Sequence, residues 1–230
     1  CERLAPIQIS YLGYPGTTGS QNIDYLVADK ILIPNGSEKY YSEKIIYMPY
    51  SYQCNDNTKK ISINNLSRSE LGLPKDGFVF TCMNANYKIK PEEFNIWMRI
   101  LSKIEDSVLW LYCSNNFAKE NLQNEAKCRG VNPKRLVFAE FMSIDKHLRR
   151  LTYGDLALDT FNVNGHTTTS DAIWSGLPVL TLLGKSFTAR VSASLLTAID
   201  VPELITYNKR QYEERAVELA TDYEKLSKLK

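Results

Sequence analysis

Short apolar segments alternate with amphipathic segments along most of the chain. Each apolar run after residue 77 has the length of a strand and is followed by a segment that is predicted to be helical. The predicted strands are Phe78–Cys82, Val108–Tyr112, Leu136–Phe138, Leu156–Leu158 and Val179–Thr181. The predicted helices begin near Pro91, Asn116, Ile144, Thr168, Arg190 and Lys209. Strands separated by helices in this way predict a doubly wound α/β domain with a parallel sheet.

The first fifty residues carry strand signals without the intervening helices. The predicted strands there are Ile7–Leu12, Tyr25–Ala28 and Lys44–Met48. This length is too short for a second doubly wound domain, so we expect the segment to be the closing part of one. The polar residues 51–66 are predicted to be a linker, and Ser67 is expected to cap a short helix that stops at Pro74.

Composition narrows the class of protein. The 28 Lys and Arg residues are nearly balanced by 26 Asp and Glu residues, which disfavours a nucleic-acid-binding protein. No apolar run has the roughly 18 residues that a membrane helix needs, so no membrane partner is expected. The five cysteines form no close pairs and no zinc-like cluster, which favours a reducing, cytoplasmic location and no metal cofactor. The N-terminus has neither an initiator Met nor a signal peptide, so we expect a fragment of a longer protein.

The strongest candidate site follows the predicted strand 156–158. Ligands of open parallel sheets bind beyond the carboxyl ends of the strands, near helix N-termini. Residues 159–171 supply a glycine, the imidazole of His166, a row of three threonine hydroxyls beginning at Thr167, and the free amides of a helix start. A phosphate fits such a site. Helix capping alone would account for one of the hydroxyls but not for the whole set.

Two other segments carry weaker signals. Lys88 follows the predicted strand 78–82, where a lysine can neutralise a phosphate, although a single loop lysine is more often solvated. His147 and Arg150 are three residues apart on one helix face, where an imidazole and a guanidinium would suit a planar base. A solvated basic face explains the same spacing.

Several segments together resemble a known family. They are residues 5–19 (APIQISYLGYPGTTG), 41–49 (YSEKIIYMP), 87–89 (YKI), 147–150 (HLRR) and 164–168 (NGHTT). In this order they are similar to the O-GlcNAc transferases, the protein O-linked N-acetylglucosaminyltransferases, and to their SPINDLY fucosyltransferase relatives. The resemblance runs from about Ala5 to the last predicted helix.

The resemblance implies a GT-B fold, in which two Rossmann-like domains face each other across a cleft. Residues 1–52 would be the C-terminal end of the N-terminal, acceptor-side domain, and residues 53–230 the UDP-sugar-binding domain. The implied activity is metal-independent, inverting transfer of GlcNAc, or a related sugar, from a UDP-sugar to Ser or Thr hydroxyls of proteins. Upstream tetratricopeptide repeats that select the protein acceptor are also implied.

The resemblance further assigns roles to residues of the candidate site. Lys88 matches the catalytic lysine that contacts the donor diphosphate. The uracil-binding positions correspond to His147 and Arg150, with the backbone near Met142 reading the base edge. The diphosphate-binding helix start corresponds to His166, Thr167 and Thr168, and His166 favours the GlcNAc-transferring branch. Asp171 matches the carboxylate on the ribose side.

Two positions depart from the family pattern. Ala85 stands where the family has glutamine, and Ile144 where it has a ribose-contacting lysine, for which Lys146 could substitute. These changes keep open an alternative function, a non-catalytic nucleotide-binding or scaffold module. A sugar-nucleotide epimerase is set aside because its glycine spacing, matched by Gly13, Gly16 and Gly19, is not followed here by a convincing helix. The family's proposed base histidine lies upstream, so we expect this chain alone to bind UDP without transfer, and to self-associate through exposed strand edges.

Overall fold

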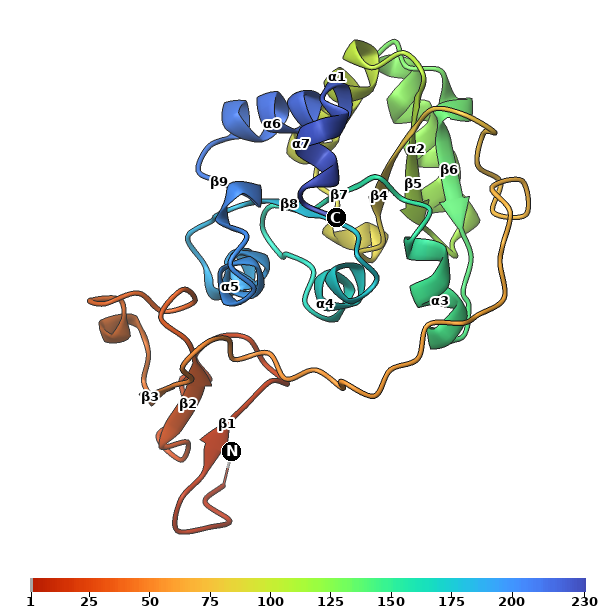
Figure 1. The fold of residues 1–230 in the computed structure, drawn as a ribbon. Helices are drawn as coiled ribbons and strands as arrows, with labels where there is room; N and C mark the ends of the chain where they lie inside the picture. Colours follow the sequence, from red (N-terminus) through yellow and green to blue (C-terminus); the bar gives the residue numbers. More distant parts are fainter. Residues whose placement is uncertain (1) are drawn as a thin grey trace.

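The computed structural model describes residues 2–230, which form two parallel sheets. The small sheet has the order β1-β2-β3, with β1 at Ile9–Ser10, β2 at Tyr25–Ala28 and β3 at Lys44–Tyr47. The large sheet has the order β6-β5-β4-β7-β8-β9, and every neighbouring pair is parallel. Figure 1 shows the small sheet below the large α/β body, joined to it by a long linker.

The elements of the large body follow the predicted alternation. Its strands are β4 (Phe78–Cys82), β5 (Ser107–Tyr112), β6 (Leu136–Ala139), β7 (Leu156–Leu158), β8 (Val179–Leu182) and β9 (Ile205–Thr206). Its helices are α1 (Pro91–Lys103), α2 (Asn116–Cys128), α3 (Ile144–Leu151), α4 (Thr167–Trp174), α5 (Val191–Ala198), α6 (Lys209–Thr221) and α7 (Tyr223–Ser227). Short 3₁₀ turns cover Glu38–Tyr40, Asn86–Lys88, Pro133–Arg135, Phe187–Ala189 and Pro202–Leu204.

The strand order indicates where a ligand-binding crevice lies in the large sheet. The first strand of the large sheet, β4, lies between the second, β5, and the fourth, β7. The chain therefore winds outward in both directions from the β4–β7 boundary. At such a boundary, the loops that follow the two adjacent strands run in opposite directions. They leave a crevice between them, beyond the carboxyl ends of the strands. The loops after β4 and β7, with the start of α4, contain Lys88 and residues 159–171, which the sequence analysis proposed as candidate phosphate-binding residues.

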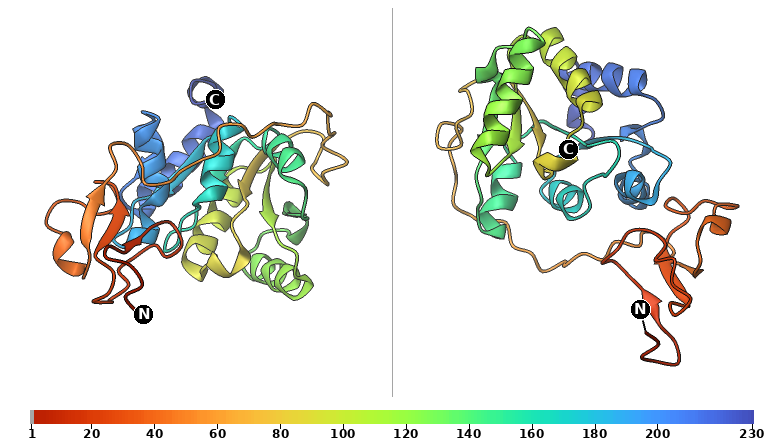
Figure 2. Two further views of the ribbon diagram at one scale, coloured as in Figure 1. Left: turned by 90° about the horizontal axis from the view of Figure 1, so that it is seen from below. Right: turned by 180° about the vertical axis from the view of Figure 1, so that it is seen from behind.

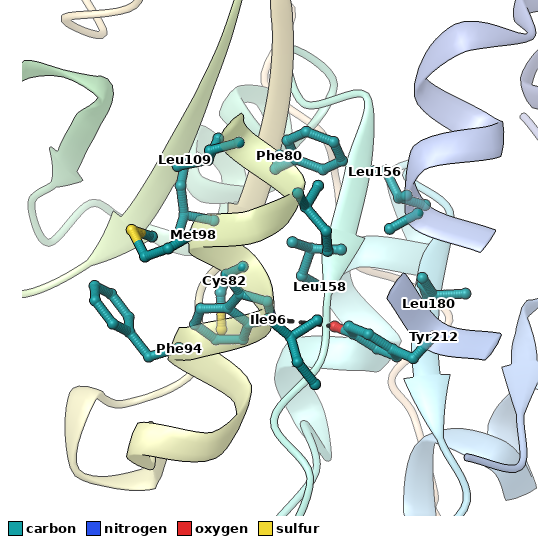
Figure 3. Close-up of a cluster of buried hydrophobic side chains, with 14 of the residues drawn as sticks. Phe80, Cys82, Phe94, Ile96, Met98, Leu109, Leu156, Leu158, Leu180 and Tyr212 are labelled. Atoms are coloured by element: carbon teal, nitrogen blue, oxygen red, sulfur yellow. Dashed lines mark hydrogen bonds between the residues drawn. The ribbon is translucent and has the colours of Figure 1, made fainter. Parts of the chain in front are cut away.

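Successive residues of the central strands face different layers, as the period of a strand requires. Phe80 and Leu109 belong to a cluster that includes residues of α1, α2 and α6, whereas Val79 and Trp110 pack in a cluster with residues of α3 and α4. Figure 3 shows the first cluster, with Tyr212 of α6 facing the strand residues. Helices on both faces explain why these strands are largely apolar.

The small sheet shares a third cluster with α5. Leu26 and Ile33 of the N-terminal segment are buried together with Val191 and Leu195 of α5. Tyr52, the last residue of the expected first domain, is 1% exposed in this cluster. The views from below and behind in Figure 2 both show the small sheet beside α5. The two sheets are therefore joined by packed side chains as well as by the linker.

Some local predictions were wrong. Residues 67–73 form a hydrogen-bonded turn rather than a helix: the Ser67 N–H and hydroxyl both donate to Glu70, but Gly72 has a φ of +70° and Pro74 follows at once. Only Ile9 and Ser10 of the predicted strand 7–12 pair with β2, since Leu12 turns to a φ of +64°. The two-residue β9 was missed. In the described part of the chain, no helix is long and apolar enough to cross a bilayer.

Candidate functional site

The loops after β4 and β7 meet as the strand order requires. Lys88, in the 3₁₀ turn after β4, is half-buried, and its Nζ donates to the carbonyl oxygen of Asn164 at 3.0 Å. Asn164 lies three residues before α4. Burial lowers the pKa of Lys88, while the nearby Asp159 carboxyl acts in the opposite direction. The ammonium group expected near a phosphate thus lies against the loop that opens α4.

The buried Asp159 carboxylate holds the loop between β7 and α4 by hydrogen bonds. It accepts from the backbone N–H of Thr160 at 2.9 Å, the N–H of Gly165 at 2.8 Å, and the Thr181 hydroxyl at 2.8 Å. The side-chain amide of Asn84 adds a donor at 3.1 Å. Burial raises the pKa of Asp159. A carboxyl with this many donors fixes the loop at the crevice, and sequence reasoning had assigned neither Asp159 nor Asn84 a role.

Helix α4 begins without a side-chain cap. His166 is its N-cap residue and, within residues 2–230, no side chain caps the first turn. Thr168 donates its hydroxyl to Asn84 Oδ1, and the Thr169 hydroxyl bonds to Ser192 at 2.8 Å. Thr169 is therefore not a ligand-facing hydroxyl, contrary to the expectation of a row of three. Thr167 is exposed, so its hydroxyl and the first amides of α4 remain available to an anion.

His166 faces the N-terminal segment. Its Nδ1 lies 3.2 Å from the hydroxyl oxygen of Tyr52, and the two rings are perpendicular. Burial, with Lys88 as a second cause, lowers the pKa of His166 to about 4, so the imidazole is neutral at physiological pH. Burial also raises the pKa of the Tyr52 hydroxyl well above its ordinary value. A protonated phenol and a neutral imidazole share a hydrogen bond here, and this contact was not expected from sequence.

A separate pocket of about 320 Å³ lies beyond β5 and β6, at the start of α3. Its lining consists of Met83, Tyr112, Phe141, Met142, Ile144, His147 and Arg150. The three uracil-site positions expected from the resemblance thus line one largely apolar hollow. Its volume and its mixture of apolar and ring side chains suit a planar base.

His147 and Arg150 contact each other in this pocket. Arg150 Nε donates to His147 Nδ1 at 3.0 Å, and a second guanidinium nitrogen donates to the Glu140 carbonyl. Arg150 is 2% exposed, which excludes the solvated basic face for this residue. Burial, with Arg150 next in effect, lowers the pKa of His147 to about 4. Arg150 orients the neutral ring of His147. Since its guanidinium already donates to His147 and to the Glu140 carbonyl, its role here is to position the pocket wall.

Asp171, on α4, is ion-paired. Its Oδ1 is 2.6 Å from Nζ of Lys59, and the two side chains are 6% and 18% exposed. Lys59 belongs to the linker that sequence analysis left without a function. Lys146, considered as a substitute for the lysine missing at Ile144, is exposed. The ammonium group beside Asp171 therefore comes from a segment more than a hundred residues earlier in the chain.

Comparison with known proteins places the chain in a family. The profile of glycosyl transferase family 41 matches residues 1–62 and 55–230. A probable UDP-N-acetylglucosamine–peptide N-acetylglucosaminyltransferase SEC of Arabidopsis thaliana is 39% identical over 98% of this chain. A SPINDLY relative from Solanum lycopersicum is 29% identical over 99% of it. The chain covers only 24% and 25% of the lengths of these two proteins.

Solved structures agree on the architecture. A mutant O-GlcNAc transferase of Thermobaculum terrenum superposes with a TM-score of 0.87 and 30% identity, over 98% of this chain and 42% of that one. This similarity confirms the GT-B-type fold that the family resemblance implied. A UDP-GlcNAc 2-epimerase of Neisseria meningitidis, at a TM-score of 0.52 and 11% identity, shares the fold alone over 71% of this chain and 41% of its own.

Proposed function

Because the chain belongs to glycosyl transferase family 41, we propose that it carries the UDP-sugar-binding region of a protein O-glycosyltransferase. The reaction is metal-independent, inverting transfer of GlcNAc, or a related sugar, from a UDP-sugar to Ser or Thr hydroxyls of a protein acceptor. The uracil binds in the pocket of Met142 and His147. The diphosphate binds between Lys88 and the start of α4, where His166, Thr167 and Thr168 lie.

One observation carries the proposal: Lys88 Nζ donates to the Asn164 carbonyl, three residues before an uncapped helix start. A cation and free amides converge where a diphosphate leaving group would gain negative charge. Preorganised donors of this kind typically contribute about 3 kcal/mol each to transition-state stabilisation. Lys88 and the α4 amides, with the exposed Thr167 hydroxyl, therefore stabilise the departing UDP.

Neither histidine of the chain is assigned as the base that deprotonates the acceptor. His147 Nδ1 accepts from Arg150, and His166 Nδ1 is engaged with Tyr52. A general base has to be placed within hydrogen-bond reach of the acceptor hydroxyl. We propose that the base, and the tetratricopeptide repeats that select acceptors, belong to a longer protein that contains this chain. The described cysteines, Cys54, Cys82, Cys113 and Cys128, are free thiols, which supports a cytoplasmic location.

Titration of UDP into the chain, followed by calorimetry, tests donor binding, with CMP as the control nucleotide. Transfer of labelled GlcNAc from UDP-GlcNAc to a Ser/Thr-rich peptide tests the reaction, for this chain and for a longer protein that includes it. We expect UDP binding by both and transfer by the longer protein. UDP binding without transfer by the longer protein would favour a nucleotide-binding scaffold, and absence of UDP binding would contradict the proposal.

A further inference from the structure

Lys59 lies in the linker, yet both its backbone and its side chain are held to α4. The side-chain ammonium is 2.6 Å from Asp171 Oδ1, and the Lys59 carbonyl accepts from the indole N–H of Trp174 at 3.3 Å. Asp171 and Trp174 are one turn apart on α4. Two contacts with one helix therefore fix the position of the ammonium group. Lys59 is not a freely rotating surface side chain.

The residues that follow Lys59 are fixed along α3. Ser62 N–H donates to the Asp145 carbonyl at 3.1 Å, and the Leu66 carbonyl accepts from the hydroxyl of Tyr153, just beyond the end of α3. Figure 1 shows the linker passing first below α4 and then beside α3. These are the helices that carry Asp171 and His147. A segment without helix or strand thus has a defined course past both halves of the candidate site.

The ion pair lies between the two halves. Asp171 is one helical turn beyond Thr167, at the uncapped start of α4. Both charges also act on the pKa of His147 in the base pocket, Asp171 raising it and Lys59 lowering it. A nucleotide with its base beside His147 and its phosphates beside the α4 start has its ribose between them. The Lys59–Asp171 pair is located where that ribose would lie.

The chemistry of the pair distinguishes among the parts of a nucleotide. An ammonium only donates hydrogen bonds, and a carboxylate only accepts them, whereas a sugar hydroxyl does both. A vicinal diol can therefore accept from Lys59 and donate to Asp171 at the same time. A phosphate would instead meet the negative charge of Asp171. The pair is also weak evidence for stability, since desolvation offsets much of the attraction between buried charges.

We propose that Lys59 is a further donor-binding residue: beside Asp171, which the family resemblance already assigns to the ribose side, Lys59 donates a hydrogen bond to the ribose diol of the uridine nucleotide. This inference rests on the proposed function, because it takes a uridine diphosphate to be the ligand. It makes the linker part of the binding site rather than a tether. It also brings an ammonium group to the ribose side of a site in which position 144 holds an isoleucine.

The test compares UDP with 2′,3′-dideoxyuridine diphosphate, titrated by calorimetry into the 230-residue chain. We expect the parent to prefer UDP by about tenfold or more, since a hydrogen bond to a charged group contributes at least that factor. Lys59→Met should reduce this preference to about threefold or less. Lys60→Met, a change of the exposed neighbouring lysine, should keep the parental preference.

The ratio of the two affinities separates ribose recognition from a structural role. A Lys59→Met chain that binds both nucleotides more weakly by the same factor, or that keeps the parental preference, overturns the inference. Because Lys59→Met leaves the buried Asp171 carboxylate without its ion pair, Lys59→Arg is measured as well, and we expect it to retain most of the preference. Loss of the preference in Lys59→Arg with no loss in Lys59→Met would also overturn it. A parent chain that binds neither nucleotide overturns the proposed function and this inference with it.

Discussion

The Tyr52 hydroxyl lies 3.2 Å from His166 Nδ1, so a residue of the N-terminal segment contacts the residue that begins α4. The phenol remains protonated and the imidazole neutral, since burial moves both pKa values in those directions. The hydroxyl and Nδ1 therefore share one hydrogen bond, whose direction is set by the tautomer of His166. The tautomer of His166 is thus coupled to its contact with Tyr52.

Replacing Tyr52 with Phe should remove this hydrogen bond while keeping the packed ring. We expect a loss of about 1 kcal/mol in the free energy of unfolding, measured with urea. We also expect a shift in the ¹⁵N resonances of His166, which report its tautomer. Tyr47→Phe is the matched control, because the Tyr47 hydroxyl bonds to Ile33 and Glu38 instead. The control should lose stability without moving the His166 resonances, and movement in both variants would contradict the assignment.

His147→Ala should weaken UDP binding by about 1–3 kcal/mol, by analogy with the contribution of one base–aromatic stacking contact. The reason is that His147 lines the pocket beyond β5 and β6, in which we propose that uracil binds, and Arg150 holds its ring in one orientation. Calorimetric titration of UDP measures the effect. Lys146→Ala, at the exposed neighbouring position, is the control and should bind as the parent does. Equal affinity in His147→Ala and the parent would exclude uracil from this pocket.

The stability of the fold should fall as the pH drops from about 6.5 to 4. Both imidazoles titrate at about 4 in the folded chain, against about 6.5 when unfolded, so the unfolded state binds more protons in this window. The limiting slope is about 1.4 kcal/mol per pH unit for each imidazole, before solvent screening reduces it. Chemical denaturation at several pH values provides the measurement. Substituting both histidines with Asn should flatten the profile between pH 6.5 and 5, and an unchanged profile would refute the assignment.

Gly165→Ala should disrupt the loop that precedes α4. A Cβ at this position would meet the hydroxyl oxygens of Thr168 and Thr169 well inside van der Waals contact, and Asn84 Oδ1 at 3.0 Å. We expect a loss of about 1–3 kcal/mol in stability and weaker UDP binding. At Gly13 an added Cβ meets nothing within 4 Å, so Gly13→Ala is the control. A Gly165→Ala chain with parental UDP affinity would show that the loop does not form the phosphate site.

UDP binding should not require a divalent cation. Lys88 and the amides at the start of α4 are positioned to neutralise the diphosphate, and the sequence has no Asp-x-Asp motif near the site. The affinity measured in EDTA should therefore equal that measured with Mn²⁺. Lys88→Met should lower the affinity in both buffers. An affinity that falls in EDTA and is restored by Mn²⁺ would contradict metal independence.

Local signals in the sequence were enough for most of the large body. The helix from Pro91 was predicted because proline and two glutamates favour a helix start and apolar residues recur behind them, and α1 begins there. The same reasoning failed at Ser67, where the capping signal is present but Gly72 and Pro74 stop the chain after one turn. A cap signal starts a helix only where the following residues can continue it.

The residues of the candidate site likewise fall into those that local signals identified and those that they did not. Lys88, His147 and the α4 start were found because each directly follows a predicted strand or lies on a predicted helix. Lys59 and Tyr52 were missed because their partners, Asp171 and His166, are 112 and 114 residues away. No local pattern marks such a residue, since a polar linker lysine looks the same whether it is solvated or paired. Only the folded chain brings these pairs together.

The cluster shared by the small sheet and α5 restricts how such proteins can recombine. Its N-terminal members all precede residue 53, and its other members, Phe187, Val191 and Leu195, lie in or just before α5. A chimera that takes residues 1–52 from one relative and the remainder from another would join two halves of a packed core that had not evolved together. Exchange of the first segment therefore requires exchange of the α5 face as well, although the two are far apart in sequence.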